Sequence, residues 1–179
     1  MIDGYPIYKF KKVKSTMDIA KDFIYENKIG IIVAEEQTEG RGRYGRKWHS
    51  PKGGLYFSFQ IKKSKLTDFL SEIVSLALIS TMRDFGLICK IKFPNDIIIN
   101  EKKICGILIE KKGEFYIVGV GINLKKVSGE YISMEELTKK SIEIDNVLDR
   151  FVGNFKKECE IFEKDFDKGI KNWCENLLK

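Results

Sequence analysis

The chain has 179 residues, which suits one compact domain with a sizeable core, and 43% of them are hydrophobic, as in ordinary globular proteins. No apolar run approaches the length of a membrane-spanning helix, and residues 1–10 lack a signal-peptide pattern, so we expect a cytoplasmic protein without a membrane partner. The 32 Lys and Arg against 26 Asp and Glu give a formal charge of +6, which favours anionic ligands but selects none by itself.

The four cysteines and the single histidine restrict the chemistry that the chain can carry. No two cysteines have the Cys-x-x-Cys spacing of zinc sites, and we expect Cys89, Cys105 and Cys159 to be reduced and buried. His49 is the only histidine, and no nucleophile elbow accompanies it. The sequence therefore excludes a multi-histidine metal site, predicts no metal ligands and argues against a Ser-His-Asp hydrolase.

Helical and extended patterns alternate in the first half of the chain. Ser15 followed by Asp18 resembles a capping box, after which apolar residues keep helical spacing. Further along, the pattern predicts a buried strand at 31–34, a Gly-Arg loop at 37–54, a strand with two different faces at 55–61 and a helix at 66–85.

The second half is predicted to contain short strands followed by helices. The pattern indicates strands at 89–93 and 97–99, a hairpin of 103–110 with 115–124, and a brief helix at 133–139. Asp145 is expected to cap a helical tail over 145–179 that carries an apolar stripe. Together these elements predict one α+β domain over residues 1–179, with a mixed, mostly antiparallel sheet packed against helices.

The most informative stretch is the loop from Gln37 to Trp48, in which glycines alternate with Arg41, Arg43 and Arg46. Glycine lets the backbone approach a ligand closely, and successive amides in such a turn can form an anion-binding nest. Arginine adds a planar fork that fits phosphate or carboxylate. From composition alone, three interpretations stay open: an anion-binding loop, a solvated basic loop and an RNA-binding Arg-Gly segment.

Three further motifs are weak in isolation. In Lys92-Phe93-Pro94-Asn95-Asp96, the proline and the Asn-Asp pair favour a turn. Lys103 opens a very apolar strand that Gly106 interrupts, and a strand glycine can mark close approach of a ligand. The stretch 119–123 lacks the full dinucleotide fingerprint, so we reject a Rossmann site.

The order of these motifs is more specific than any one of them, and it resembles the catalytic domain of biotin protein ligases. Ser15-Thr16 comes first, followed by the Gly-Arg run at 40–48, the motif at 92–96, Lys103 with Gly106, and Gly119 to Asn123. The Gly-Arg run separates this family from lipoate ligases, which share its class II synthetase-like fold. Met17 departs from the pattern, because the family commonly has asparagine there.

The resemblance implies an ATP-dependent, AMP-forming ligase. Biotin and ATP, assisted by Mg²⁺, would give biotinyl-5′-AMP, and a lysine of a biotin carboxyl carrier protein, as in acetyl-CoA carboxylase, would accept the biotin. Neither the helix-turn-helix domain nor the C-terminal β-barrel domain of many members is expected in this chain, so DNA is not an expected partner. A homodimer is left open.

The resemblance also assigns residues to roles. Those expected at biotin are Ser15, Thr16, Met17, Gln37, Gly40, Arg41, Gly42, Arg43, Lys103 and Gly106. Those expected at ATP are Arg43, Trp48, Asn95, Asp96, Lys103 and Asn123. Lys103, Arg43, Arg41 and Asp96 would be the catalytic residues. The loop at 40–48 is expected to close over the ligand and exclude water.

Three alternatives to a biotin ligase remain at this stage. One is a lipoate or octanoate ligase or transferase of the same fold. The others are a non-catalytic module that holds biotin or a nucleotide, and a basic RNA-binding protein, whose affinity would fall steeply with salt.

Overall fold

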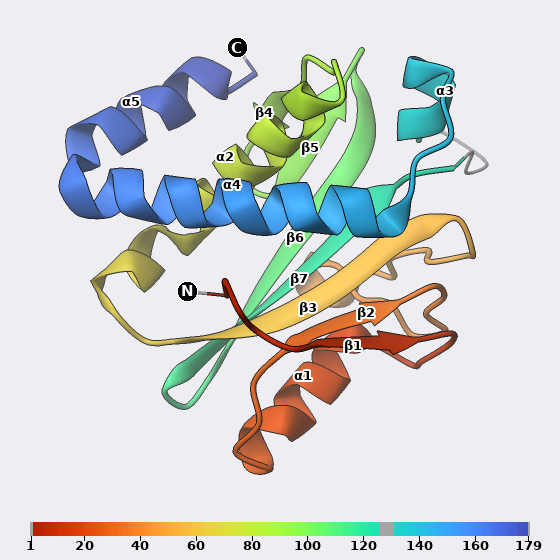
Figure 1. Cartoon of the computed structure of the whole chain (residues 1–179), viewed down its shortest axis with the longest axis vertical. Helices are drawn as coiled ribbons and strands as arrows, with labels where there is room; N and C mark the ends of the chain where they lie inside the picture. The colour runs from red at the N-terminus through yellow and green to blue at the C-terminus, as the bar shows by residue number, and fades with distance from the viewer. Residues whose placement is uncertain (1, 126–130, 179) are drawn as a thin grey trace.

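The computed structural model describes residues 2–125 and 131–178, and a seven-stranded sheet forms its centre (Figure 1). The strand order is β1-β2-β3-β7-β6-β5-β4. β1 and β2 pair in parallel and the other neighbouring strands pair antiparallel, which confirms the predicted mixed, mostly antiparallel sheet. The strands are β1 (Ile7–Phe10), β2 (Ile31–Ala34), β3 (Gly54–Lys62), β4 (Lys90–Lys92), β5 (Asp96–Ile99), β6 (Lys102–Lys112) and β7 (Phe115–Asn123).

β1 is a strand that the sequence pattern did not predict, because its four residues are exposed or half-buried and form no apolar run. Its pairing with β2 continues past the strand ends, where the Val13 amide donates to Glu36 O at 3.1 Å and the Thr38 amide donates to Val13 O at 3.0 Å. Lys12 and Glu36 form an ion pair of 2.7 Å across the same gap. This extension brings Thr16 and Gln37 side by side.

Helices cover both faces of the sheet, as Figure 1 shows. α2, α4 and α5 pack together on one face, and α1 lies on the other against β2, β3 and β7. The helices are α1 (Thr16–Tyr25), α2 (Leu70–Asp84), α3 (Met134–Thr138), α4 (Ile144–Lys164) and α5 (Phe166–Asn176). Short 3₁₀ turns occupy Arg43–Gly45 and Lys65–Phe69, so the helix predicted from residue 66 begins as an α-helix only at Leu70.

The polar face of β3 is buried beneath α1 rather than exposed to solvent. Gln60 donates to Ala20 O at 2.9 Å and accepts from the Gly30 amide at 3.2 Å, while Ser58 and Thr16 share a hydrogen bond of 2.7 Å. Because these buried polar groups are paired, burying them carries little penalty, and they fix α1 on the sheet.

The helical tail consists of two helices. α4 ends at Lys164, Asp165 adopts a non-helical conformation, and its carboxylate accepts from the Lys168 amide to cap α5. The N-cap of α4 is Glu143, so Asp145 lies in the first turn instead of capping it. The apolar stripe itself is confirmed as core: Phe151 packs edge-on against the ring of β3 residue Phe57 at 4.9 Å.

The residues that follow α5 pair with the edge of the sheet. The Leu178 amide donates to Ile91 O at 2.8 Å, so the C-terminal end covers the outer edge of β4. Of the helices in residues 2–125 and 131–178, none is long and apolar enough to cross a membrane.

The cysteines give a direct test of this core. Cys89, Cys105 and Cys159 are buried, as predicted, whereas Cys174 is exposed. Burial raises the pKa of Cys89 and of Cys159 to about 12 and raises the pKa of Cys105 as well, so at pH 8 these three groups remain thiols and react poorly. With Ellman's reagent at pH 8 we expect one thiol per chain to react rapidly, and Cys174→Ser should remove this reaction. The other three thiols should react only after denaturation. Several fast equivalents in the folded protein would contradict this core.

Candidate active site

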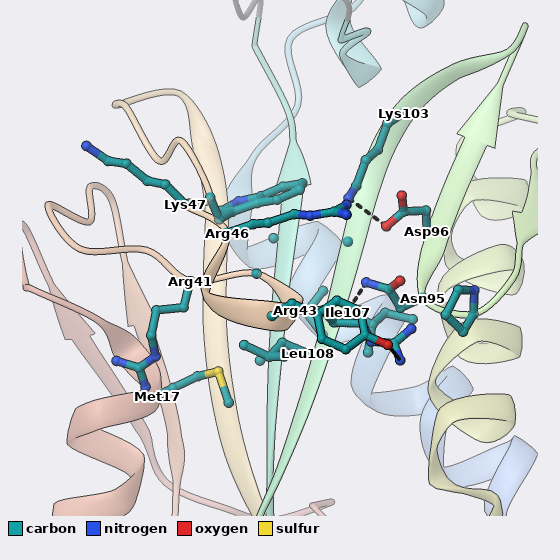
Figure 2. Close-up of a pocket in the computed structure, with 18 of the residues that line it drawn as sticks. Met17, Arg41, Arg43, Arg46, Lys47, Asn95, Asp96, Lys103, Ile107 and Leu108 are labelled. Atoms are coloured by element: carbon teal, nitrogen blue, oxygen red, sulfur yellow. Dashed lines mark hydrogen bonds and ion pairs between the residues drawn. The ribbon is translucent and has the colours of Figure 1, made fainter.

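A cavity of about 430 Å³ lies on the α1 side of the sheet, bounded by the start of α1, the Gly-Arg loop and the turn before β5 (Figure 2). Of the fourteen residues assigned to the site by resemblance, twelve line it: Ser15, Thr16, Met17, Gln37, Arg41, Gly42, Arg43, Trp48, Asn95, Asp96, Lys103 and Gly106. Gly40 and Asn123 are not among the lining residues. The contacts of all fourteen with a ligand remain predictions.

One end of the cavity is a neutral hydrogen-bonding network. The Gln37 side-chain oxygen accepts from the Thr16 amide at 2.8 Å and from the Thr16 hydroxyl at 3.1 Å, and its Nε2 donates to Ser50 Oγ at 3.0 Å. Ser15 is the N-cap of α1 by position, but its side chain makes no capping hydrogen bond, so the predicted capping box is wrong. Amide and hydroxyl groups of this kind suit an uncharged ligand group that both donates and accepts hydrogen bonds.

Glycines form the floor of the cavity because large side chains lie directly on the sheet. Gly106 of β6 is paired with Gly121 of β7, and the Trp48 indole covers both. A Cβ atom on Gly106 would lie 2.9 Å from the Trp48 ring, and one on Gly121 would overlap Trp48 Nε1. At Gly119, a Cβ atom would lie 2.7 Å from Met17 Sδ. Glycine at 106 and 121 therefore permits the close approach of the Trp48 ring, and glycine at 119 leaves room for the Met17 side chain.

Lys103 stands at the centre of the charged end. Its Nζ forms an ion pair of 2.6 Å with Asp96 Oδ1 and lies 4.6 Å from the centre of the Trp48 ring, a cation–π contact (Figure 2). About a quarter of each side chain in the pair is exposed. An ammonium group held in this way by one carboxylate and one ring has a fixed position from which it can meet an incoming anion.

Lys103 and Gly106 face the same cavity because β6 contains a bulge. β5 residue Ile97 pairs with Cys105, but its neighbour Ile98 pairs with Lys103, so the register skips Ile104. In a regular strand, residues three apart project to opposite faces. Here Ile104 and Cys105 are both buried in the core on the helical side of the sheet, and Lys103 returns to the cavity side.

The Gly-Arg loop is a small hairpin rather than an open coil. Arg41 and Lys47 pair antiparallel, the Gly42 amide donates to Arg46 O at 2.6 Å, and Tyr44 at the tip has a left-handed φ of 58°. The Arg43 guanidinium stacks on Tyr44, 5.0 Å from the ring centre. In Figure 2 the Arg46 side chain extends toward Lys103, whereas Lys47 points away.

The charge of the lining is strongly positive. Six of the described lining residues are cationic: Arg41, Arg43, Arg46, Lys47, Lys92 and Lys103. Asp96 is the one carboxylate among the described residues of the lining. This excess of positive charge over one carboxylate favours a ligand with several negative charges.

Both asparagines expected at ATP donate hydrogen bonds to backbone carbonyl groups. Asn95 donates to Ile107 O at 3.0 Å and its own carbonyl accepts from the Ile107 amide at 2.9 Å, which fastens the turn before β5 to β6. Asn123 donates to Lys103 O at 3.4 Å and to Ile132 O at 3.3 Å. Both side chains therefore support the elements that carry the cavity, whatever further contact they make with a ligand.

Sequence reasoning left several lining residues without a role. They are Tyr44, Arg46, Lys47, Lys92, Phe93, Pro94, Ile107, Leu108, Gly119, Val120, Gly121 and Tyr131. The spacing of Gly119 and Gly121 carried a usable signal, since residues two apart in a strand share a face. Tyr131, whose ring lies 6.4 Å from that of Trp48, carried none, because the two are brought together only by the fold.

Residues 9–126 match the biotin/lipoate A/B protein ligase family, and this range contains most of the cavity lining and well over half of the chain. The chain belongs to this family. Among the biotin/lipoate ligases, the bifunctional ligase/repressor BirA of Escherichia coli (strain K12) is 29% identical, over 92% of this chain and 56% of that protein. Biotin–protein ligase 2 of Arabidopsis thaliana is 30% identical, over 89% of this chain and 54% of that protein. The chain thus spans little more than half the length of these relatives.

Solved structures of biotin/lipoate ligases agree over nearly the whole chain. The biotin protein ligase of Leishmania major in complex with biotinyl-5-AMP superposes with a TM-score of 0.86 at 28% identity, covering 97% of this chain and 83% of that one. The ligase of Aquifex aeolicus in complex with biotin and ATP has a TM-score of 0.85 at 29% identity, covering 97% and 78%. The predicted fold is therefore confirmed.

The glycine floor yields a prediction for Trp48. Gly121→Ala should displace the indole, because the new methyl group would clash with Trp48 Nε1. In a Trp173→Phe background, which leaves Trp48 as the only tryptophan, we expect the fluorescence emission to shift to longer wavelength. Gly153→Ala is the matched control, since a Cβ atom there meets nothing within 4 Å. An unchanged emission maximum in Gly121→Ala would refute the close packing.

Proposed function

We propose that this protein is a biotin protein ligase that joins biotin to ATP as biotinyl-5′-AMP and then transfers biotin to a lysine of a carrier protein. The observation that carries the proposal is one cavity with two unlike ends on a shared glycine floor. The Thr16–Gln37 network suits the neutral ureido group of biotin, and the cations around Lys103 suit its carboxylate and the phosphates. Relatives with this activity, and solved ligases with biotinyl-5-AMP or with biotin and ATP, support it.

In the first step, a biotin carboxylate oxygen attacks the α-phosphorus of ATP and pyrophosphate leaves. Two anions must approach one another, and negative charge grows on the phosphoryl oxygens. Lys103 is fixed by Asp96 and Trp48, so its charge is already in place and needs no reorganisation as the reaction proceeds. Arg43 adds a second cation from the hairpin. The remaining contribution is the alignment of the two substrates.

In the second step, the amine of the carrier lysine attacks the acyl carbon of the adenylate. The bond between this carbon and the phosphate oxygen breaks, and AMP leaves. The product is an amide, and one proton is lost from the amine. No nucleophile of the enzyme takes part. Asp96 keeps Lys103 beside the departing phosphate, and Trp48 covers the floor on which the nucleotide would lie.

Mg²⁺ fits this site as the companion of the triphosphate rather than as a resident ion. The described residues contain no cluster of three or more metal-binding side chains, and Asp96 is the carboxylate among those that line the cavity. Mg²⁺ commonly uses one or two carboxylates together with substrate phosphates and water, which is compatible with such a lining. When bound, it would offset charge on the phosphates.

We also propose that the acceptor is a biotin carboxyl carrier domain. Residues 1–179 work as one catalytic unit, since α4 and α5 complete the core that supports the sheet. The reaction takes place in the cytoplasm, where ATP and reduced cysteines are expected.

Intact-mass analysis of an apo carrier domain tests the function directly. Incubation with this protein, biotin, ATP and Mg²⁺ should add the mass of one biotinyl group, and omission of any component should abolish the gain. Lipoate in place of biotin serves as the substrate control. A mass gain with lipoate but not with biotin would move the assignment to the lipoate branch, and pyrophosphate release without mass gain would show that transfer fails.

Single substitutions test the assigned catalytic residues. Lys103→Ala and Arg43→Ala should each slow pyrophosphate release in the first turnover by about 10²–10³-fold, because each removes charge that stabilises the transition state. The matched controls are Lys102→Ala, an exposed neighbour in the same strand, and Arg150→Ala on the surface of α4. Adenylation at the wild-type rate in folded Lys103→Ala protein would defeat the assignment.

A further inference from the structure

Arg41 differs from the other cations of the Gly-Arg loop because its charge is already paired. Its Nη1 donates to Asp18 Oδ1 at 2.7 Å, and its Nη2 lies 3.8 Å from Glu110 Oε2. Figure 2 shows the Arg41 side chain running toward α1 and away from Lys103. The Arg41 side chain is 34% exposed. Arg41 is therefore occupied by protein acids rather than directed at the anionic end.

The two acids come from the elements that form the cavity. Asp18 follows Met17 in α1, and Glu110 lies two residues beyond Leu108 in β6, on the same face of that strand. Arg41 thus connects the hairpin of residues 41–47 to α1 and to β6.

The hairpin is attached at two points with different chemistry. After its second strand, Trp48 lies on the glycine floor, and the Trp48 amide donates to Gly40 O at 2.9 Å and closes the base of the hairpin. In its first strand the attachment is the ion triad of Arg41, Asp18 and Glu110. Between the two, Arg43 and Arg46 extend over the cavity. A segment fastened only by Trp48 could swing about that point, whereas two attachments fix its orientation.

We propose that Asp18 and Glu110 are positioning residues that act through Arg41 to hold the hairpin over the cavity before any ligand binds. This inference rests on the proposed function, because it assigns the triad a role in retaining biotin and its adenylate. Arg41 is then a positioning residue too, and the loop needs less ordering by the ligand than its composition suggests. The triad limits escape of the adenylate and entry of water, and it leaves the charge at Lys103 unchanged.

Trypsin digestion of the protein without ligands tests the proposal independently of activity. Arg46 and Lys47 are exposed cleavage sites at the hairpin, and cleavage there reports how often the hairpin leaves the sheet. Asp18→Asn combined with Glu110→Gln should raise the cleavage rate about fivefold, the range expected for loss of partly exposed ion pairs. Asp18→Glu should retain most of the wild-type protection. Lys9–Asp145 is a matched 2.7 Å ion pair elsewhere, and Asp145→Asn should leave cleavage at the hairpin unchanged.

A double-mutant cycle separates the triad from general destabilisation. Arg41→Gln should raise the cleavage rate as much as the two acid substitutions do. The triple variant should be cleaved no faster than Arg41→Gln alone, because each of these variants removes the same interaction. Additive effects, or unchanged cleavage in the acid variants, would overturn the proposal.

Kinetics give the second readout. Without carrier, adenylate that leaves the site is hydrolysed in solution and pyrophosphate release continues. The acid variants should raise this carrier-independent rate about fivefold and raise KM for biotin, with little change in kcat for transfer. If the wild type biotinylates the carrier and the variants match it in trypsin cleavage and in carrier-independent pyrophosphate release, the triad proposal fails while the ligase proposal stands. If the wild type shows no ligation, trypsin cleavage still decides whether the triad holds the hairpin.

Discussion

The bulge in β6 is the constraint on which the site depends. Without the extra residue at Ile104, the alternation of the strand would direct Lys103 into the core when Gly106 faces the cavity. An ammonium group on that side would lie among the apolar side chains beneath α2 and α4 and would be strongly disfavoured. The bulge places the lysine, the glycine floor and Trp48 on one surface, and Asp96 at the start of β5 then has a cation within reach.

The neutral end of the cavity depends on a different feature, the burial of polar groups under α1. Thr16 is held by Gln37 and Ser58, and Gln60 holds the helix through its backbone. These contacts join β3, α1 and the start of the Gly-Arg loop into one rigid arrangement. The same network that keeps α1 on the sheet therefore also orients the groups that would meet a ligand, so stability and recognition share residues.

Much of the fold and half of the residues that line the cavity were accessible from the sequence, because they depend on local signals. Periodicity located β2, β3 and α2, and the order of the motifs at 15–16, 40–48, 92–96 and 103–106 located the cavity. The errors have physical causes. β1 buries no residue fully, Glu143 rather than Asp145 is the N-cap of α4, and Ser15 precedes α1 without a side-chain capping bond. The pairing of Arg41 with Asp18 and Glu110 is long-range, and no local pattern predicts it.

The pairing of Leu177 and Leu178 with β4 has a consequence for the behaviour of the protein in concentrated solution. An edge strand presents free amide and carbonyl groups, which can recruit a strand from another chain and begin aggregation. β4 has one partner strand, β5, and the backbone of Leu178 occupies part of its other side through the carbonyl of Ile91. The final turn of the structure thus protects the sheet from unwanted strand addition, a task separate from both the core and the cavity.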